Sequence, residues 1–160
     1  MENIRLINFT ELTLEQKEMV LIWRNSPEIR KWMYNQEEIV LNDHLNFIKS
    51  LKLRKDKLYF LVEKDKKYIG VIDFTEIIEE ESLHMGIYTN PNTKGNGKIL
   101  LNKIIDYSFA TLKVKKIFSE VFSQNNKAYE LYGKYNFKDM SKKTINNKEV
   151  ICMELNYEDR

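Results

Sequence analysis

The sequence is poor in the residues that mark secreted, membrane-spanning and repetitive proteins. Its 160 residues include one cysteine, two prolines and five glycines. A single cysteine, Cys152, cannot form a disulfide within the chain, and no apolar run approaches the roughly 20 residues that a membrane-spanning helix needs. The first residues also lack the long apolar core of a signal peptide. We therefore expect a cytoplasmic protein that does not enter a membrane.

The chain also lacks a large excess of positive or of negative charge. The chain has 26 Lys and Arg against 24 Asp and Glu, so its net charge is +2 and no strong field directs it toward nucleic acid. No internal repeat or linker-like tract divides the chain, and 42% apolar residues suffice for a packed core. Residues 1–160 are therefore expected to form a single domain.

The hydrophobic patterns predict an α/β fold of the α+β type. One helix is expected to begin after Thr13, where Gln16 completes a capping box, and a second at Pro27. Further helices are expected at about 42–51, 97–112 and 126–135. Because a helix separates the fourth and fifth strands, these two are expected to be parallel, whereas the hairpin strands are antiparallel. The expected strands cover residues 4–9, 58–63, 68–77, 82–89, 116–122, 137–140 and 149–157.

Two glycines, Gly95 and Gly97, precede the helix expected at 97–112. Backbone N–H groups at a helix start have no partners within the helix and lie at the positive end of its dipole, so they bind phosphate well. Glycine allows the close approach, and Lys94 and Lys98 add positive charge. This pattern predicts a pyrophosphate site, although a G-x-G pattern by itself is also typical of a plain turn before a helix.

The segment from Asn125 to Phe137 combines a polar helix start with a capped end. Asn125 or Asn126 can accept hydrogen bonds as the N-cap, and Asn136 is the next best residue after glycine for a left-handed helix end. One helix face carries residues spaced for burial, namely Ala128, Leu131 and Tyr135. The pattern predicts a helix that packs on a sheet.

The sequences N-P-N-T-K-G-N-G-K-I-L-L (90–101) and N-N-K-A-Y-E-L-Y-G-K-Y-N-F (125–137) resemble two motifs of the GCN5-related N-acetyltransferases. The resemblance implies a mixed, mostly antiparallel seven-stranded sheet with helices on both faces and a splay between its parallel fourth and fifth strands. It implies acetyl-CoA as the acetyl donor, with no metal. The pantetheine arm would insert into the splay like an added strand. Asn92 stands where the family has Gln or Arg.

By the same resemblance, the cofactor contacts fall on three segments. The pyrophosphate loop would comprise Lys94, Gly95, Asn96, Gly97 and Lys98. The edge of the fourth strand would contribute Gly86, Ile87 and Tyr88, and the last helix Asn125, Lys127 and Tyr132. Glycine inside a strand marks a bulge or a close backbone approach, so Gly86 is the expected position of a bulge in the fourth strand.

Acetyl transfer to an amine needs an acceptor for the amine proton and a donor for the leaving sulfur. The resemblance assigns the donor role to Tyr132, which is protonated at neutral pH because a tyrosine has an ordinary pKa near 10. Candidate bases, acting directly or through water, are Asp73, Glu76 and His84. Asp73 and Thr75 are expected on one strand face, with Glu76 pointing the other way. Helix packing remains the alternative for Tyr132, and a solvated surface position the alternative for Glu76.

The segments W-R-N-S-P-E-I-R-K-W-M (23–33), D-H-L-N-F-I (43–48) and Y-I-G-V-I-D-F-T-E-I (68–77) resemble the N-acetyltransferases of pseudaminic acid biosynthesis. The resemblance implies acetylation of the 4-amino group of UDP-4-amino-4,6-dideoxy-N-acetyl-beta-L-altrosamine, a step toward bacterial flagellin glycosylation. It places Arg24 and His44 at the diphosphate, Met33 and Phe47 at the base, and Asp73, Thr75 and Tyr88 near the sugar.

Two alternatives remain open at this stage. A ribosomal-protein or peptide N-terminal acetyltransferase would share the fold but favour an acidic acceptor groove, whereas Arg24, Arg30, Lys31 and His44 favour a nucleotide sugar. A noncatalytic acyl-CoA-binding module would keep the cofactor site and not need Tyr132. Core packing is the alternative role for the aromatic acceptor residues. An exposed aromatic face would also permit a homodimer.

Overall fold

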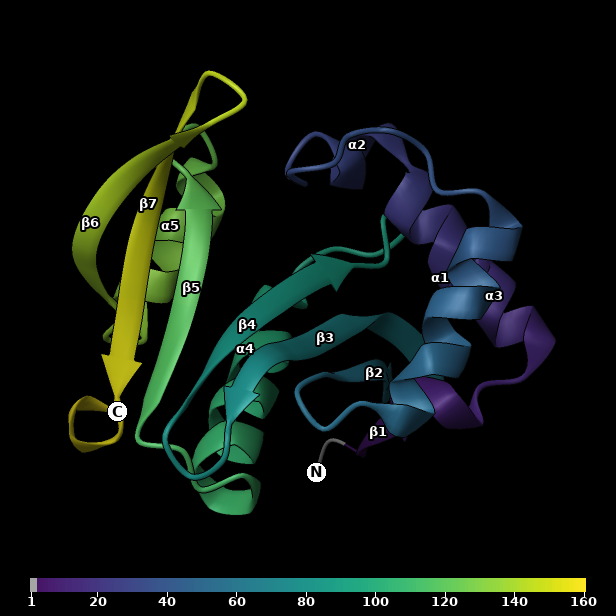
Figure 1. Ribbon diagram of the computed structural model, residues 1–160, viewed down its shortest axis with the longest axis horizontal. Coiled ribbons are helices and arrows are strands. Elements are labelled where there is room, and N and C mark those ends of the chain that lie inside the picture. Colours follow the sequence, from purple (N-terminus) through teal and green to yellow (C-terminus); the bar gives the residue numbers. More distant parts are fainter. Residues whose placement is uncertain (1–2) are drawn as a thin grey trace.

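The computed structural model describes residues 3–160, which build a seven-stranded sheet with helices on both faces (Figure 1). The strand order is β1-β2-β3-β4-β5-β7-β6, and β4 and β5 run parallel while the other neighbouring pairs are antiparallel. The expected fold class is confirmed. The strands are β1 Ile4–Asn8, β2 Leu58–Lys64, β3 Lys67–Ile78, β4 Ser82–Thr89, β5 Lys116–Phe122, β6 Lys138–Ile145 and β7 Lys148–Asn156.

Among residues 3–160, five helices flank the sheet. They are α1 Leu14–Asn25, α2 Pro27–Arg30, α3 Leu41–Ser50, α4 Gly97–Asp106 and α5 Asn126–Lys134. Successive side chains of a strand point to opposite faces of the sheet, so the sheet has one core on each face. Leu61 and Val71 pack with α1 and α3 in one core, and Phe60 and Ile72 pack with α4 in the other. Thus α1 and α3 lie on one face of the sheet, and α4 and α5 on the other (Figure 1). No helix among the described residues is long and apolar enough to cross a membrane.

The caps inferred from the sequence are present. Thr13 and Gln16 form the reciprocal capping box at the start of α1, with N···O distances of 3.1 and 2.9 Å. Pro27 occupies the first turn of α2. Asn125 is the cap of α5, because its side-chain oxygen accepts a hydrogen bond from the Ala128 N–H. The helix ends at Lys134, and Asn136 beyond it is left-handed, with a φ of 71°.

Two elements differ from the expected ones. The helix expected at 97–112 is α4 followed by a π-helical turn, Tyr107–Thr111, in which the Leu112 N–H donates to the Tyr107 carbonyl. The sixth strand is twice as long as the expected 137–140. Most side chains of β6 are exposed, so no apolar alternation marked it. Its true signal is the pair Asn146 and Asn147, both at positive φ, which is the turn chemistry of a two-residue hairpin.

The sheet opens between β4 and β5. These strands pair through three rungs, Ser82 with Lys116, Leu83 with Ile117 and His84 with Phe118. Beyond them β4 stays paired with β3, and β5 with β7, so the two strands part. We call this gap the sheet opening and define it by residues 85–89 of β4 and 119–122 of β5. It is the splay that the sequence resemblance implied.

The bulge expected at Gly86 lies elsewhere. The β3–β4 register runs through the pair of Asp73 and Gly86 without a shift, and breaks between Thr75 and Ile78. Within that break Glu76 has a φ of 47°. Glycine at position 86 instead lets the Asp73 carboxylate lie close to the β4 backbone. A Cβ there would lie 2.6 Å from Asp73 Oδ1. The irregularity is therefore in β3, where it changes the direction of Glu76.

Candidate active site

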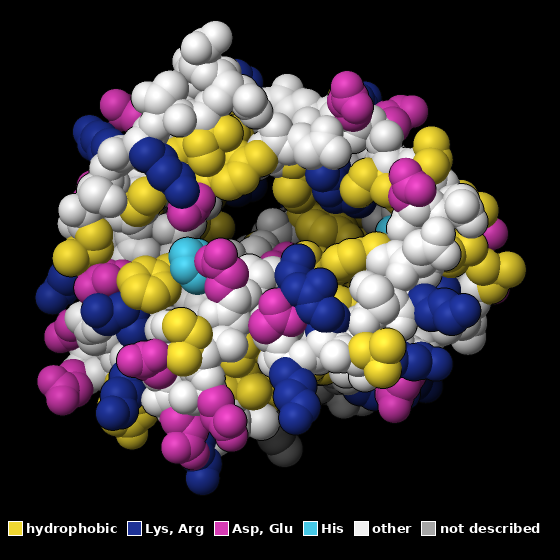
Figure 2. Space-filling model, viewed as in Figure 1, with side chains coloured by type: hydrophobic (Ala, Val, Ile, Leu, Met, Phe, Trp, Pro, Cys, Tyr) yellow, Lys and Arg dark blue, Asp and Glu magenta, His cyan; other side chains and the backbone are white. Residues whose placement is uncertain are grey.

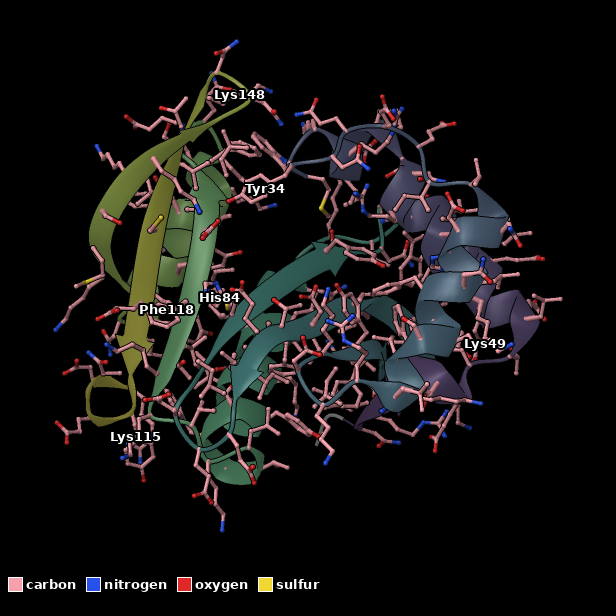
Figure 3. All side chains as sticks on the ribbon, in the orientation of Figure 1. Tyr34, Lys49, His84, Lys115, Phe118 and Lys148 are labelled. Carbon is pink, nitrogen blue, oxygen red and sulfur yellow. The ribbon has the colours of Figure 1, made fainter. Side chains whose placement is uncertain are left out.

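A cavity of about 700 Å³ occupies the sheet opening. Its walls come from both faces of the sheet, since Arg24 and Met33 belong to the α1–α3 side, whereas Asn125 and Tyr132 belong to α5. Figure 2 shows the hollow at the centre of the molecule, and Figure 3 places His84 beside it. A ligand that enters from one face can thus meet a ligand that enters from the other.

Asp73 lines this cavity from β3 and lies against Gly86. Burial raises the pKa of its carboxyl to about 7, although Lys57 acts in the opposite direction. Burial first, and then the nearby Asp73 charge, raise the pKa values of Tyr88 and Tyr59 as well. A carboxyl with a pKa near neutrality exchanges a proton readily at physiological pH, which suits a general base.

Gly86→Ala is expected to destabilise the protein by about 1–3 kcal/mol, because the new methyl group would overlap the Asp73 carboxylate. Urea unfolding measures this change. Gly133→Ala is the matched control, since no atom lies within 4 Å of a Cβ there and alanine is the better helix former. Equal stability of Gly86→Ala and the unmodified protein would show that the carboxylate is free to move away.

Tyr132 differs from its two neighbouring helix tyrosines. The Tyr129 hydroxyl donates to Asp139 Oδ2 at 2.7 Å, and the Tyr135 hydroxyl accepts from Asn102 at 3.3 Å, so both are engaged outside the cavity. Tyr132 instead lines the cavity. Burial, and then the Asp73 charge, raise the pKa of Tyr132 to about 12. Its proton is therefore retained at neutral pH and available for donation.

His84 and Glu76 lie within hydrogen-bond distance of each other at the edge of the cavity. His84 Nε2 lies 2.9 Å from Glu76 Oε2, and the His84 ring packs on Phe118 with centroids 5.0 Å apart. The prediction that Glu76 points away from Asp73 and Thr75 is wrong, because Glu76 contacts His84, which pairs with Thr75 and therefore lies on the same face of the sheet. Regular alternation fails at the β3 bulge, where the left-handed backbone turns Glu76 toward His84. This pair is a second candidate base.

The sequence did not predict three residues that line the cavity, namely Tyr34, Glu120 and Lys143. The Tyr34 hydroxyl donates to Glu120, and Lys143 Nζ lies 2.9 Å from Glu120 Oε2. Burial acts to raise the pKa of Glu120, but the two hydrogen bonds and the Lys143 charge together lower it below its ordinary value. Tyr34 lies in the loop before α3, and Lys143 lies in the part of β6 that was not expected. A motif search had no pattern to find here, because the three come from separate segments.

Arg24 lines the cavity, and one of its guanidinium nitrogens has no hydrogen-bond partner among the described residues. Its Nη2 donates to the Asn35 carbonyl at 3.1 Å, while its Nη1 is buried and has no partner among the described residues. Burial lowers the pKa of Arg24, against the opposing effect of Tyr88 and Tyr59. A buried guanidinium nitrogen without a partner is costly. Because Nη1 has almost no accessible surface, an anionic oxygen in the cavity would reach it only after the guanidinium turns toward the cavity.

His44 also lines the cavity, but its role differs from the expected cationic one. It is 6% exposed, and its Nε2 lies 2.8 Å from the Lys17 carbonyl oxygen, which makes Nε2 the donor. Burial lowers the pKa of His44, so the ring is neutral at physiological pH. Nδ1 is then left as a hydrogen-bond acceptor. A neutral His44 offers no charge to a diphosphate, although it can help shape the site.

The remaining acceptor residues divide into two groups. Met33, Phe47, Thr75 and Tyr88 line the cavity, with Phe47 packed edge-on against Tyr59 at 5.0 Å. Arg30 and Lys31 do not line it. Arg30 donates to the backbone carbonyls of Asn25 and Gln36, and Lys31 lies over the Trp32 ring. Of the residues expected to make the groove basic, Arg24 therefore supplies the positive charge in the cavity.

The expected cofactor residues are also divided. Gly86, Ile87, Tyr88, Asn125 and Tyr132 line the cavity, whereas residues 94–98 and the exposed Lys127 lie outside it. Gly95 is left-handed with a φ of 78°, and Asn96 begins α4 without capping it through its side chain. A Cβ on Gly97 would lie 3.2 Å from Leu131 of α5. The open N-terminus of α4 is thus held next to the helix that carries Tyr132.

Comparison with known proteins agrees with this geometry. Residues 17–137 match the model of the acetyltransferase (GNAT) family. The chain belongs to the acetyltransferase (GNAT) family. It is 44% identical to acetyltransferase PseH of Campylobacter jejuni over 84% of each chain. The crystal structure of C. jejuni N-acetyltransferase PseH in complex with acetyl coenzyme A superposes with a TM-score of 0.81 and 36% identity, covering 97% of this chain and 99% of that one.

A further solved structure matches in fold alone. Spermidine N-acetyltransferase from Vibrio cholerae, in complex with CoA and spermine, has a TM-score of 0.83 but 24% sequence identity, covering 99% of this chain and 96% of that one. The predictions of the family, the fold and an N-acetyltransferase activity are confirmed by these similarities. The roles of individual residues remain predictions.

Proposed function

We propose that the protein transfers the acetyl group of acetyl-CoA to the 4-amino group of a UDP-linked amino-dideoxy sugar. The expected substrate is UDP-4-amino-4,6-dideoxy-N-acetyl-beta-L-altrosamine, an intermediate of pseudaminic acid biosynthesis. The observation that carries the proposal is the cavity through the sheet opening, in which Asp73, Tyr132 and Arg24 converge from both faces. The 44% identity to PseH supports it.

The cofactor side of the proposal uses backbone groups. Where β4 leaves β5, the β5-facing edge of residues 85–89 is unpaired in the sheet, which suits the amides of a pantetheine arm that adds like a strand. Asn125 uses its side-chain oxygen to cap α5, which leaves its amide N–H groups for the arm. The uncapped start of α4 suits the pyrophosphate, with Lys94 and Lys98 beside it.

The proposed reaction is a direct transfer. Asp73, ionised above its pKa of about 7, accepts a proton from the substrate ammonium and leaves a neutral amine. The nitrogen attacks the thioester carbonyl carbon to give a tetrahedral intermediate. When the C–S bond breaks, Tyr132 donates its proton to the sulfur, and the nitrogen gives its second proton to the Tyr132 oxygen. The products are therefore an amide, the free thiol of coenzyme A and a neutral Tyr132. Both groups lie in one cavity, which allows a single ternary complex.

The acceptor side uses Arg24 and apolar surface. Arg24 lines the cavity, and its guanidinium is proposed to turn so that the unpartnered Nη1 donates to one oxygen of the UDP diphosphate. Met33 and Phe47 provide thioether and aromatic surface for the uracil ring. Thr75 and Tyr88 lie on the strands nearest Asp73 and are proposed to contact the sugar.

The experiment that tests the proposal follows thiol release from acetyl-CoA with three acceptors in parallel, namely the 4-amino UDP-sugar, basic peptides and spermidine. Turnover of the UDP-sugar supports the assignment. Peptides are the serious alternative, because Glu76 and Glu120 add negative charge to the cavity. Turnover of peptides or spermidine without turnover of the UDP-sugar would overturn the substrate. Acetyl-CoA binding without turnover of any acceptor would favour a noncatalytic module.

Arg24→Ala is expected to raise the KM for the UDP-sugar by about tenfold or more, since a charge-assisted hydrogen bond is lost. The KM for acetyl-CoA is expected to change by less than about twofold, on the same scale. Steady-state kinetics with each substrate varied in turn measure both values. Arg54→Ala is the control, because Arg54 pairs with Asp56 outside the cavity. An equal rise in both KM values would remove Arg24 from the acceptor site.

A further inference from the structure

The transfer site is divided between two halves of the molecule. Asp73 and Arg24 belong to the half built from β1–β4 and α1–α3, which share one core. Tyr132 and Asn125 belong to the half built from β5–β7 and α5. Along the sheet the halves are joined by the three rungs between β4 and β5, all on one side of the sheet opening. On the α4 face they also share the larger core, which contains Leu83 of β4 and Ile117 of β5. Because a misplacement of about 1 Å can cost about a hundredfold in rate, the relative position of the halves matters for transfer.

Tyr34 joins the two halves across the sheet opening. Its hydroxyl donates to Glu120 of β5, its ring packs edge-on against Phe122 at 5.6 Å, and its carbonyl accepts from Asn146 Nδ2 at 2.9 Å. Figure 3 shows Tyr34 directed toward β5 from the loop that precedes α3. Within residues 3–160, these hydrogen bonds are the ones that connect residues 14–50 with β5–β7. We call this set of contacts the Tyr34 clasp.

The loop that carries the clasp is held firmly to its own half. Asn25 at the end of α1 pairs with both backbone groups of Ile39, through distances of 2.9 and 2.8 Å. Arg30 donates to the carbonyl oxygens of Asn25 at 2.7 Å and Gln36 at 3.1 Å. Both ends of the loop are thus fixed by hydrogen bonds. A contact made by its tip can therefore set the position of α1, and with it Arg24, relative to β5.

We propose that Tyr34 is a positioning residue of the transfer reaction, which aligns the acceptor half of the cavity with the cofactor half. This inference rests on the proposed two-substrate transfer. Tyr34 does not need to touch either substrate for this role, because it acts through Glu120, Phe122 and Asn146. Its removal then affects the step in which both substrates are present. Each substrate on its own keeps its binding site.

The test compares Tyr34→Phe, which keeps the ring and loses the hydroxyl, with Asn146→Gly, which keeps the left-handed turn and loses the amide donor. We expect kcat to fall about tenfold in the first and about threefold in the second, in line with the loss of one charged and one neutral hydrogen bond. The KM values for both substrates are expected to stay within about twofold on the same scale. Tyr129→Phe is the control, because it removes a tyrosine–carboxylate hydrogen bond outside the cavity.

Amide hydrogen exchange gives a readout that does not depend on the substrate. In Tyr34→Phe we expect faster exchange of the backbone amides of residues 85–89 and 119–122, because the hydrogen bond that connects the two sides of the sheet opening is lost. If the UDP-sugar is not turned over, the proposed function is wrong. The exchange measurement would still show whether the Tyr34 clasp holds the two halves together. Two results would overturn the inference, namely unchanged exchange and kcat, or a rise in the acceptor KM alone, which would indicate direct substrate binding.

Discussion

Tyr132→Phe is expected to lower kcat by about a hundredfold or more, which is the scale of a positioned general acid. The dissociation constant for acetyl-CoA is expected to change little, because the change removes one hydroxyl and keeps the ring against Phe137, whose centroid lies 5.8 Å away. Without the donor, the sulfur must leave as a thiolate or take its proton from water. Single-turnover kinetics together with calorimetric titration of coenzyme A measure the two quantities separately.

The helix supplies its own control for this change. Tyr129→Phe removes a hydroxyl three residues away, one that is committed to Asp139 and lies outside the cavity, and is expected to leave kcat unchanged. Comparable turnover in Tyr132→Phe and Tyr129→Phe would place the acid elsewhere. Turnover that persists only in Tyr129→Phe would also exclude the noncatalytic acyl-CoA-binding module.

The order of the elements was predictable because most of them carry local signals. The capping box at Thr13, the left-handed Asn136 and the alternation of β5 each depend on residues close together in the sequence. The length of β6 was not predictable by the same means, since both its faces are largely exposed and apolar alternation is absent. The twin asparagines at 146 and 147 were the available signal, and they mark the turn rather than the length of the strand.

The site was predictable where a family motif or a strand position fixed it. Tyr132 came from a motif, and Asp73 from its place on a central strand. Glu76 was misplaced because one left-handed residue breaks the period of two on which the inference relied. Tyr34 and Lys143 owe their positions to tertiary contacts with Glu120, more than 20 residues distant from either in sequence. No local sequence pattern predicts a contact between residues this far apart in the sequence.

Asp73→Asn is expected to lower kcat/KM for the acceptor by about a hundredfold and to abolish its rise with pH. In the unmodified protein this rise is centred near pH 7, because burial raises the pKa of Asp73 to about 7 and only the ionised form accepts a proton. Asparagine has nearly the same shape and cannot take up the proton. The pH profile of kcat/KM between pH 5 and 9 measures the change, with the amino group of the free sugar nucleotide titrated separately.

Stability gives an independent check on the same carboxyl. The pKa of Asp73 is near 4 in the unfolded chain and about 7 in the folded protein, so between these values the native state holds a proton that the unfolded state has lost. Its contribution to stability is therefore complete below about pH 4 and is lost as the pH rises through about 7. Asp73→Asn is expected to remove this decline in urea unfolding. If the pH profile of activity survives in Asp73→Asn and disappears in His84→Gln, the base is the His84–Glu76 pair.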